Sequence, residues 1–363
     1  MNKQLINILK FLVFLGVGVG ILYYVYYNQN IAFQENCALE GIPPEECSLA
    51  EKVLDDFRGV NYFWILMVLT AFTLSNVSRA YRWRMLLQSL GYKPRFGNAF
   101  MAVLMNYFAN LFLPRIGEVV RAGTITRFEK IPLEKVIGTV VVGRILDVIC
   151  LLIVTGITLL LEYDKLMSYF SQGSGDDVPD ESSGWLLWLG LAASIFGVLF
   201  FLFRKQIQAT RFYKKIVDIL KGFVEGLRTI MRLERPWVFI LHSVNVWVLY
   251  FMMNYICLYA FMPTAHLGPG AGLMVFVYGS LGIVIPSPGG MGTYQWLVVQ
   301  ALALYGIGQD DAFSFANILF FSVQIGCNVF LGLLTYLYLP FYNQNYEPAL
   351  PTGAAAPVSH AAG

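Results

Sequence analysis

Long apolar runs separated by short polar stretches dominate the pattern of this chain. A helix needs about 20 apolar residues to cross the hydrocarbon core of a bilayer, and about six runs approach or exceed that length. These runs are 11–27, 61–81, 136–161, 185–203, 236–261 and 312–339. The pattern predicts an all-α polytopic membrane protein with about six spanning helices.

Two further apolar segments are shorter, and each ends at a break that is rich in proline and glycine. The break after 97–113 contains Pro114 and Gly117, and the break after 269–285 contains Pro286, Pro288, Gly289 and Gly290. If the first segment crossed the membrane completely, the arginines and lysines after it would lie outside, against the positive-inside bias. We therefore expect two re-entrant helical hairpins, near 97–130 and 269–306, which enter from opposite sides as an inverted repeat.

The distribution of charge assigns the polar stretches to the two sides of the membrane. Stretches 28–60 and 162–184 are acidic, whereas 79–95 and 204–235 carry most of the lysines and arginines. The basic stretches are expected on the cytoplasmic side, and both chain ends with them. Arg79 fits a residue that extends to the lipid headgroups.

Three smaller expectations complete the organisation of the chain. Apolar residues recur at intervals of three and four residues within 205–235, which favours an amphipathic helix on the cytoplasmic leaflet. Residues 1–340 form a single transmembrane domain, and the low-complexity segment 341–363 is a disordered tail. Cys37 and Cys47 share an expected outer loop, where they either pair as a disulfide or remain free thiols.

The composition supports this class and excludes several others. The chain is 57% hydrophobic and only 13% charged, with a mean hydropathy of +0.60, whereas soluble domains are about 25% charged. It has no phosphate-binding GxxxxGK[ST] loop, no CxxC pair, three widely separated histidines and no basic patch with interleaved aromatic residues. We expect no cofactor, no metal site and no nucleic-acid partner.

Polar and charged residues between 106 and 147 are the candidates for a functional site. Charges inside apolar segments cost several kcal/mol unless they face a protein-lined or wet cavity, so they mark function; the simpler alternative is a cytoplasmic loop. Arg144 and Asp147 lie three residues apart and can pair with each other or with the first hairpin. The candidate set for binding a lipid headgroup is Asn106, Asn110, Arg115, Glu118, Arg121, Arg144 and Asp147.

Three segments resemble the lysylphosphatidylglycerol synthase transmembrane-region family, also called the flippase-like domain family. They are NLFLPRIGEVVRA at 110–122, GTVVVGRILDV at 138–148 and IPSPGGMGTYQ at 285–295, and the resemblance covers roughly residues 5–340. It implies an inner-membrane fold with two re-entrant hairpins and a role in moving lipids between leaflets. Two-domain relatives continue into a soluble aminoacyl-transferase domain, so a stand-alone form without synthase activity is expected.

The chain departs from the family pattern at two places. Relatives often carry a glutamate before the arginine that matches Arg144, and this chain has Gly143. An arginine late in the second repeat is also expected, and the segment Ile318–Ser322 is uncharged. The second departure leaves the second repeat without the arginine expected for a headgroup contact from that side.

The leading functional hypothesis is a lipid flippase or scramblase rather than an enzyme. Arginine meets phosphate with a planar fork of donors, so Arg115, Arg121 and Arg144 would bind a phospholipid headgroup. A membrane-embedded transferase with Glu118 or Asp147 as general base, or a non-catalytic scaffold, are the alternatives. The expected partners are a phospholipid and the membrane, with a homo-oligomer or a separate lipid-modifying enzyme as further candidates.

Overall fold

A computed structural model describes residues 3–39, 43, 47–113, 115–173, 230–285 and 287–348. The expected span at 185–203, most of the expected amphipathic helix and residues 349–363 of the expected tail lie outside these residues, as do Pro114 and Pro286. The chain forms two compact units, one of Met1–Glu162 with Leu233–Gly363 and the other of Tyr163–Arg232. Helix α7 (Tyr163–Gly173) belongs to the smaller unit. Everything below concerns the larger unit.

All regular structure in the described part of the chain is helical. Four helical stretches are long and apolar enough to cross a membrane: α3 (Tyr62–Gln88), α6 (Leu133–Leu161), α10 (Pro236–Leu258) and the continuous stretch Gln309–Tyr342. They coincide with four of the six expected spans. The expected span at 11–27 lies within α1 (Lys3–Leu39), a helix of 37 residues. The all-helical membrane class is therefore confirmed.

The first proline- and glycine-containing break is the turn of a helical hairpin. Helix α4 (Phe96–Asn110) packs against α5 (Gly117–Glu129), which runs back beside it. A Cβ on Gly117 would collide with the backbone carbonyl oxygen of Asn106, so only glycine permits this close approach. The Gly117 amide also donates to Oδ1 of Asn110 over 2.8 Å, which joins the two helices at the turn.

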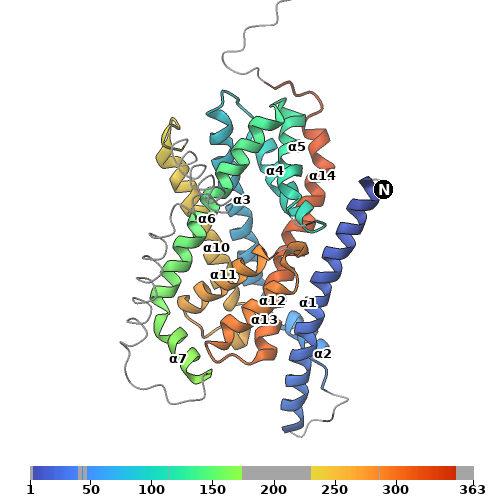
Figure 1. Ribbon diagram of the computed structural model, residues 1–363, viewed down its shortest axis with the longest axis vertical. Helices are drawn as coiled ribbons and strands as arrows, with labels where there is room; N and C mark the ends of the chain where they lie inside the picture. The colour runs from blue at the N-terminus through green and yellow to red at the C-terminus, as the bar shows by residue number, and fades with distance from the viewer. Residues whose placement is uncertain are drawn as a thin grey trace, which may run out of the picture. The chain divides into compact units, whose positions relative to one another are not determined.

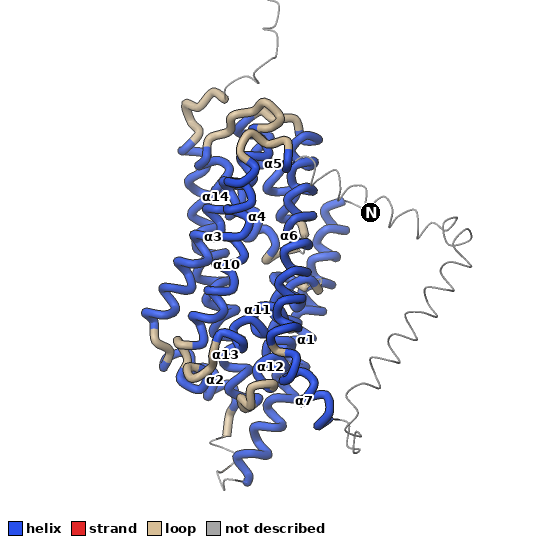
Figure 2. The backbone as a smooth tube through the Cα atoms, turned by 90° about the vertical axis from the view of Figure 1, so that its left-hand side faces the viewer, coloured by secondary structure: helices blue, strands red, loops and turns tan. Residues whose placement is uncertain are grey.

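The second break is also the turn of a helical hairpin. Helix α11 (Pro269–Val284) packs against α12 (Thr293–Ala303). Three glycines in the turn have positive φ angles, which a residue without Cβ adopts at little cost: Gly289, Gly290 and Gly292. In both views the α4–α5 hairpin lies toward one end of the larger unit and α11–α12 toward the other (Figures 1 and 2).

The long helices hold these hairpins in place. Helix α3 packs along α10, and a buried cluster that includes Trp83, Ile125 and Val136 joins α3, α4, α5 and α6. Helix α13 (Gln309–Val323) continues through a π-helical turn, Gln324–Val329, into α14 (Phe330–Tyr342). Helix α14 packs on α4, and α13 packs on α12. The interrupted helix therefore contacts both hairpins, with the π turn between the two contacts.

A disulfide and an ion-pair cluster secure the connection between α1 and α3. Cys37 and Cys47 are bonded, so the structure adopts the disulfide alternative. The bond ties the end of α1 to the segment before α2 (Leu49–Gly59). From α2, Nζ of Lys52 reaches Oδ1 of Asp311 over 2.6 Å, at the start of α13. Helix α2 is therefore held against the base of α13.

Candidate functional site

A cavity of about 360 Å³ lies between the turns of the two hairpins. Asn110 and Leu111 of the first hairpin and Gly289 of the second line it, together with residues of α3, α6, α10 and the π turn. The two turns are close, because a Cβ on Gly289 would lie only 3.3 Å from Cδ2 of Leu111. Its volume is within the range of small-molecule sites, roughly 300–1,000 Å³. The cavity therefore lies where the two glycine-containing hairpin turns approach each other.

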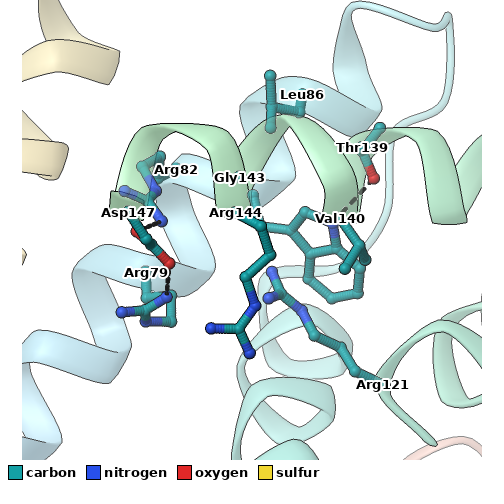
Figure 3. A pocket seen from close by; sticks show the side chains of 10 residues that line it. Arg79, Arg82, Leu86, Arg121, Thr139, Val140, Gly143, Arg144 and Asp147 are labelled. Atoms are coloured by element: carbon teal, nitrogen blue, oxygen red, sulfur yellow. Dashed lines mark hydrogen bonds and ion pairs between the residues drawn. The ribbon is translucent and has the colours of Figure 1, made fainter. Parts of the chain in front are cut away.

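One side of the cavity is built around Asp147 of α6. Its carboxylate oxygens accept from Nη1 of Arg79 and Nη2 of Arg82, each over 2.7 Å (Figure 3). Arg79 and Arg82 are buried, and the side chain of Asp147 is only 13% exposed. Arg79 also donates from Nη2 to the hydroxyl of Tyr250 over 3.1 Å, and that hydroxyl is 2.7 Å from the hydroxyl of Tyr107. Asp147 thus fixes α3 against α6, and Arg79 extends the network to α10 and α4.

A second ion pair links α6 to the first hairpin. Nε of Arg144 lies 2.6 Å from Oε1 of Glu118, on the first turn of α5. Both side chains are more exposed than those around Asp147, at 50% for Arg144 and 34% for Glu118. Of the two alternatives for Arg144, pairing with the hairpin is the one observed, and Asp147 pairs with α3 instead.

Arg121 differs from the other three arginines because it has no acidic partner among the described residues. Its guanidinium carbon lies 3.7 Å from the centre of the Trp83 ring, in a cation–π arrangement. Trp83 in turn donates from Nε1 to the hydroxyl of Thr139 over 3.0 Å, which holds the ring in place. The buried Nε of Arg121 has no hydrogen-bond partner in the described structure.

The four arginines therefore outnumber the two carboxylates around them. Arg79, Arg82, Arg121, Arg144 and Asp147 line a small pocket at the edge of the cavity, and in Figure 3 the dashed contacts of Asp147 run to Arg79 and Arg82 only. Arg144 is neutralised by Glu118. Asp147 offsets only one of the two charges of Arg79 and Arg82, and Arg121 has no acidic partner among the described residues. The excess positive charge makes this part of the cavity suitable for an anion.

Near the turn of the second hairpin, the polar side chains that line the cavity are uncharged. Nε2 of Gln324 donates to the carbonyl of Gly289 over 2.7 Å, and Nδ2 of Asn328 donates to Oε1 of Gln324 over 2.6 Å. Both side chains come from the π turn in the last long helix, and π turns within helices are frequent at functional sites. The turn of the second hairpin is thus held by amides, while charged side chains surround the first.

The structure distributes the seven candidate residues unevenly. Asn106, Asn110, Arg121, Arg144 and Asp147 line the cavity. Glu118 is outside the lining and contacts it through Arg144. Arg115 is exposed at the hairpin turn with a φ of 67°, and the structure places it apart from the cavity-lining residues.

Sequence reasoning missed the two arginines of α3. Arg79 was expected to extend toward lipid headgroups, but it is only 8% exposed and pairs with Asp147. Arg82 lies one turn further along and binds the other oxygen of the same carboxylate. The available signal was their three-residue spacing, which puts both guanidinium groups on one helix face where a single carboxylate can accept from both.

The fold and the cavity together define the class of protein. The chain is a helical multi-pass membrane protein with a cavity, lined by apolar residues and by several charged and amide side chains, between two helical hairpins. It belongs to the family of the lysylphosphatidylglycerol synthase TM region, whose model matches residues 49–332. This membership confirms the resemblance and is consistent with a membrane protein related to lipids.

Comparison with single proteins adds one relative. A UPF0104 membrane protein of Methanocaldococcus jannaschii is 32% identical over 100 residues, which cover 27% of this chain and 30% of that protein. The chain thus matches less than a third of the length of this curated relative. No solved structure matches the chain.

Proposed function

We propose that this protein moves phospholipids between the two leaflets of the membrane, as a flippase or scramblase. The observation that carries the proposal is a cavity between two hairpin turns lined by Arg121, a half-buried residue that has no acidic partner among the described residues and whose enclosed Nε has no hydrogen-bond partner there. A charge without a partner inside a membrane protein is costly, and natural membrane proteins keep such groups where a substrate or pathway needs them. An anionic headgroup would supply the missing partner.

Phosphate chemistry explains the preference for arginine at this place. A phosphodiester carries one negative charge and accepts paired hydrogen bonds from a planar guanidinium group. At 4 Å and an effective dielectric constant of 20, the attraction between two unit charges is about 4 kcal/mol. Arg121 would bind the phosphate, and Arg144, which Glu118 holds in place, would be the second contact. The apolar residues that share the cavity, such as Leu151 and Ile283, would accommodate acyl chains.

The proposal includes a membrane topology with six spans and two re-entrant hairpins. The ends of α3 and α5 and the segments after them carry basic residues, whereas α2 and the start of α13 carry acidic ones. The positive-inside bias then puts the base of α4–α5 in the cytoplasm and the base of α11–α12 outside. The hairpins would meet near the midplane of the inner membrane, where inverted-repeat transporters hold their substrates.

A vesicle assay tests this function directly. The purified protein is reconstituted with an acyl-labelled fluorescent phosphatidylglycerol, and a membrane-impermeant reductant removes the fluorescence of the outer leaflet. We expect the protein to raise the reducible fraction above that of protein-free vesicles. Arg121→Gln should slow lipid movement about tenfold, the effect of about 1.4 kcal/mol on a barrier.

The matched control is Arg58→Gln. Arg58 lies on α2 with 79% of its side chain exposed, outside the cavity, and its loss should leave the rate unchanged. The proposal is wrong if parent vesicles behave like protein-free ones, or if Arg121→Gln moves lipid as fast as the parent. The latter outcome would favour a scaffold whose buried charges only support the fold.

A further inference from the structure

The cavity offers different chemistry to the two parts of a lipid headgroup. We propose, on the basis of the proposed function, that the transported lipid is an anionic phosphodiester whose headgroup is uncharged and rich in hydroxyl groups, such as glycerol or a sugar. The phosphate would lie at Arg121 and the hydroxyl groups at the side-chain amides of Asn106 and Asn328. A headgroup with an amine, whether zwitterionic or aminoacylated, would be disfavoured.

The carboxylates near the cavity are already committed to arginines. Asp147 is the only acidic residue among the described side chains that line the cavity, and both of its oxygens accept from arginines. Glu118, just outside the lining, pairs with Arg144. An ammonium group in this cavity would therefore find no free carboxylate, while the unpaired charge of Arg121 would repel it.

Two buried amide oxygens remain available for a donor. Oδ1 of Asn106 and Oδ1 of Asn328 have no hydrogen-bond partner in the described structure, and both residues line the cavity. Their side chains are buried, at 5% and 6% exposed. A buried acceptor without a partner costs about 1–3 kcal/mol, so a ligand that donates to it gains affinity. Hydroxyl groups supply such donors without bringing a positive charge.

The orientation of Asn328 follows from a chain of hydrogen bonds that begins at the backbone. The carbonyl of Gly289 can only accept, so the amide nitrogen of Gln324 must face it, over 2.7 Å. The oxygen of Gln324 then accepts from the nitrogen of Asn328 over 2.6 Å. This order leaves the oxygen of Asn328, rather than its nitrogen, as the unpartnered atom. The turn of the second hairpin thus sets the chemistry that the headgroup meets.

The π turn explains how these amides come to face the cavity. In the segment Gln324–Val329 the helix is wider than an α-helix, and Gln324 and Asn328, four residues apart, both line the cavity. Asn106, on α4 and one turn before Asn110, lines the same cavity. Arg121 is on α5, so the proposed phosphate and hydroxyl contacts come from different helices. A headgroup that made both sets of contacts would bridge the first hairpin and the interrupted last helix.

The test compares headgroups in one vesicle system. Acyl-labelled phosphatidylglycerol, phosphatidylethanolamine, phosphatidylcholine and lysyl-phosphatidylglycerol are reconstituted separately with the parent protein. We expect the glycerol headgroup to move about tenfold faster than any lipid that carries an amine. If no lipid moves, the proposed function fails and this inference with it. If all four move equally, or an amine-bearing lipid moves fastest, the function stands and this inference is overturned.

A substitution that changes one atom type sharpens the comparison. Asn328→Asp adds a carboxylate where the free amide oxygen lies, so it should slow the glycerol lipid and speed the lysyl lipid. The variant also loses the hydrogen bond that Nδ2 of Asn328 donates to Gln324, so its folding is checked first. The matched control is Asn61→Asp, because exposed Asn61 caps α3 from outside the cavity and aspartate caps a helix equally well. An unchanged headgroup ranking in a folded Asn328→Asp variant would contradict the assignment. If that variant does not fold, Asn106→Asp tests the same reversal from α4.

Discussion

The two hairpins present different side chains to the cavity that they share. Around the first hairpin lie Arg121, the Glu118–Arg144 pair and the buried cluster of Asp147. The turn of the second hairpin is held by Gln324, and no charged side chain lines that side of the cavity within the described residues. Both hairpins reverse at glycine-containing turns, so the same backbone arrangement carries charge in one half and neutral amides in the other.

This difference separates the role of the fold from the role of the site. The reversal of a hairpin depends on backbone geometry, which glycine provides at Gly117 and at Gly282 alike. The electrostatic character depends on Glu118 and Arg121 of α5 itself. It also depends on residues from neighbouring helices, since Arg79 and Arg82 come from α3 and Arg144 and Asp147 from α6. Two hairpins that both reverse at glycine-containing turns can therefore give a cavity with charge on one part of its lining only.

The largest effect on stability is expected from Asp147→Asn. This change leaves Arg79 and Arg82 buried without a counter-charge, and breaking a buried ion pair in this way costs about 3–5 kcal/mol. Thermal unfolding of the detergent-solubilised protein should show a much lower Tm, or the variant should fail to purify. Asp55→Asn, which breaks the exposed pair with Arg58, is the control and should leave Tm unchanged. A normal Tm for Asp147→Asn would mean that the cluster does not hold α3 to α6.

An intermediate effect is expected where the helices of each hairpin approach most closely. A Cβ at Gly282 would lie 2.8 Å from the Cα of Tyr294, and one at Gly117 would meet the backbone of Asn106. Overpacking of this kind costs about 1–3 kcal/mol, so Gly117→Ala and Gly282→Ala should each lower Tm. Gly123→Ala on α5 is the matched control, since no atom lies within 4 Å of its added Cβ. Equal Tm values for all three variants would show that close backbone contact does not define the hairpins.

The sequence predicts features that are visible within one segment, such as a charge whose burial in lipid would be unfavourable. It does not predict features that depend on pairing between residues far apart in the chain. Charges within apolar segments and proline–glycine breaks are visible one segment at a time, which is why Asn106, Arg121 and Asp147 could be selected. The role of Arg79 could not be predicted, because it depends on Asp147, a partner 68 residues away. An arginine near the end of a span has the same local sequence pattern whether it pairs inside the protein or extends to lipid headgroups. The side chain of Arg115 is directed by its own left-handed backbone conformation in the turn, which the pattern of apolar residues does not encode.

The smallest effect on stability is expected from Glu118→Gln. This variant also distinguishes the Glu118–Arg144 pair most sharply from the ion pairs of Asp147. The Glu118–Arg144 pair is a third to a half exposed, and pairs of this kind contribute at most about 1 kcal/mol, so Tm should hardly change. Lipid movement should nevertheless slow a few-fold, because Arg144 loses the carboxylate that orients it toward the cavity. The vesicle assay measures this, with Glu118→Asp as the charge-preserving control that should retain more of the parent rate. A large loss of Tm without a specific loss of rate would place Glu118 with Asp147 among the residues that hold the fold, and would leave Arg121 as the sole arginine of the headgroup site.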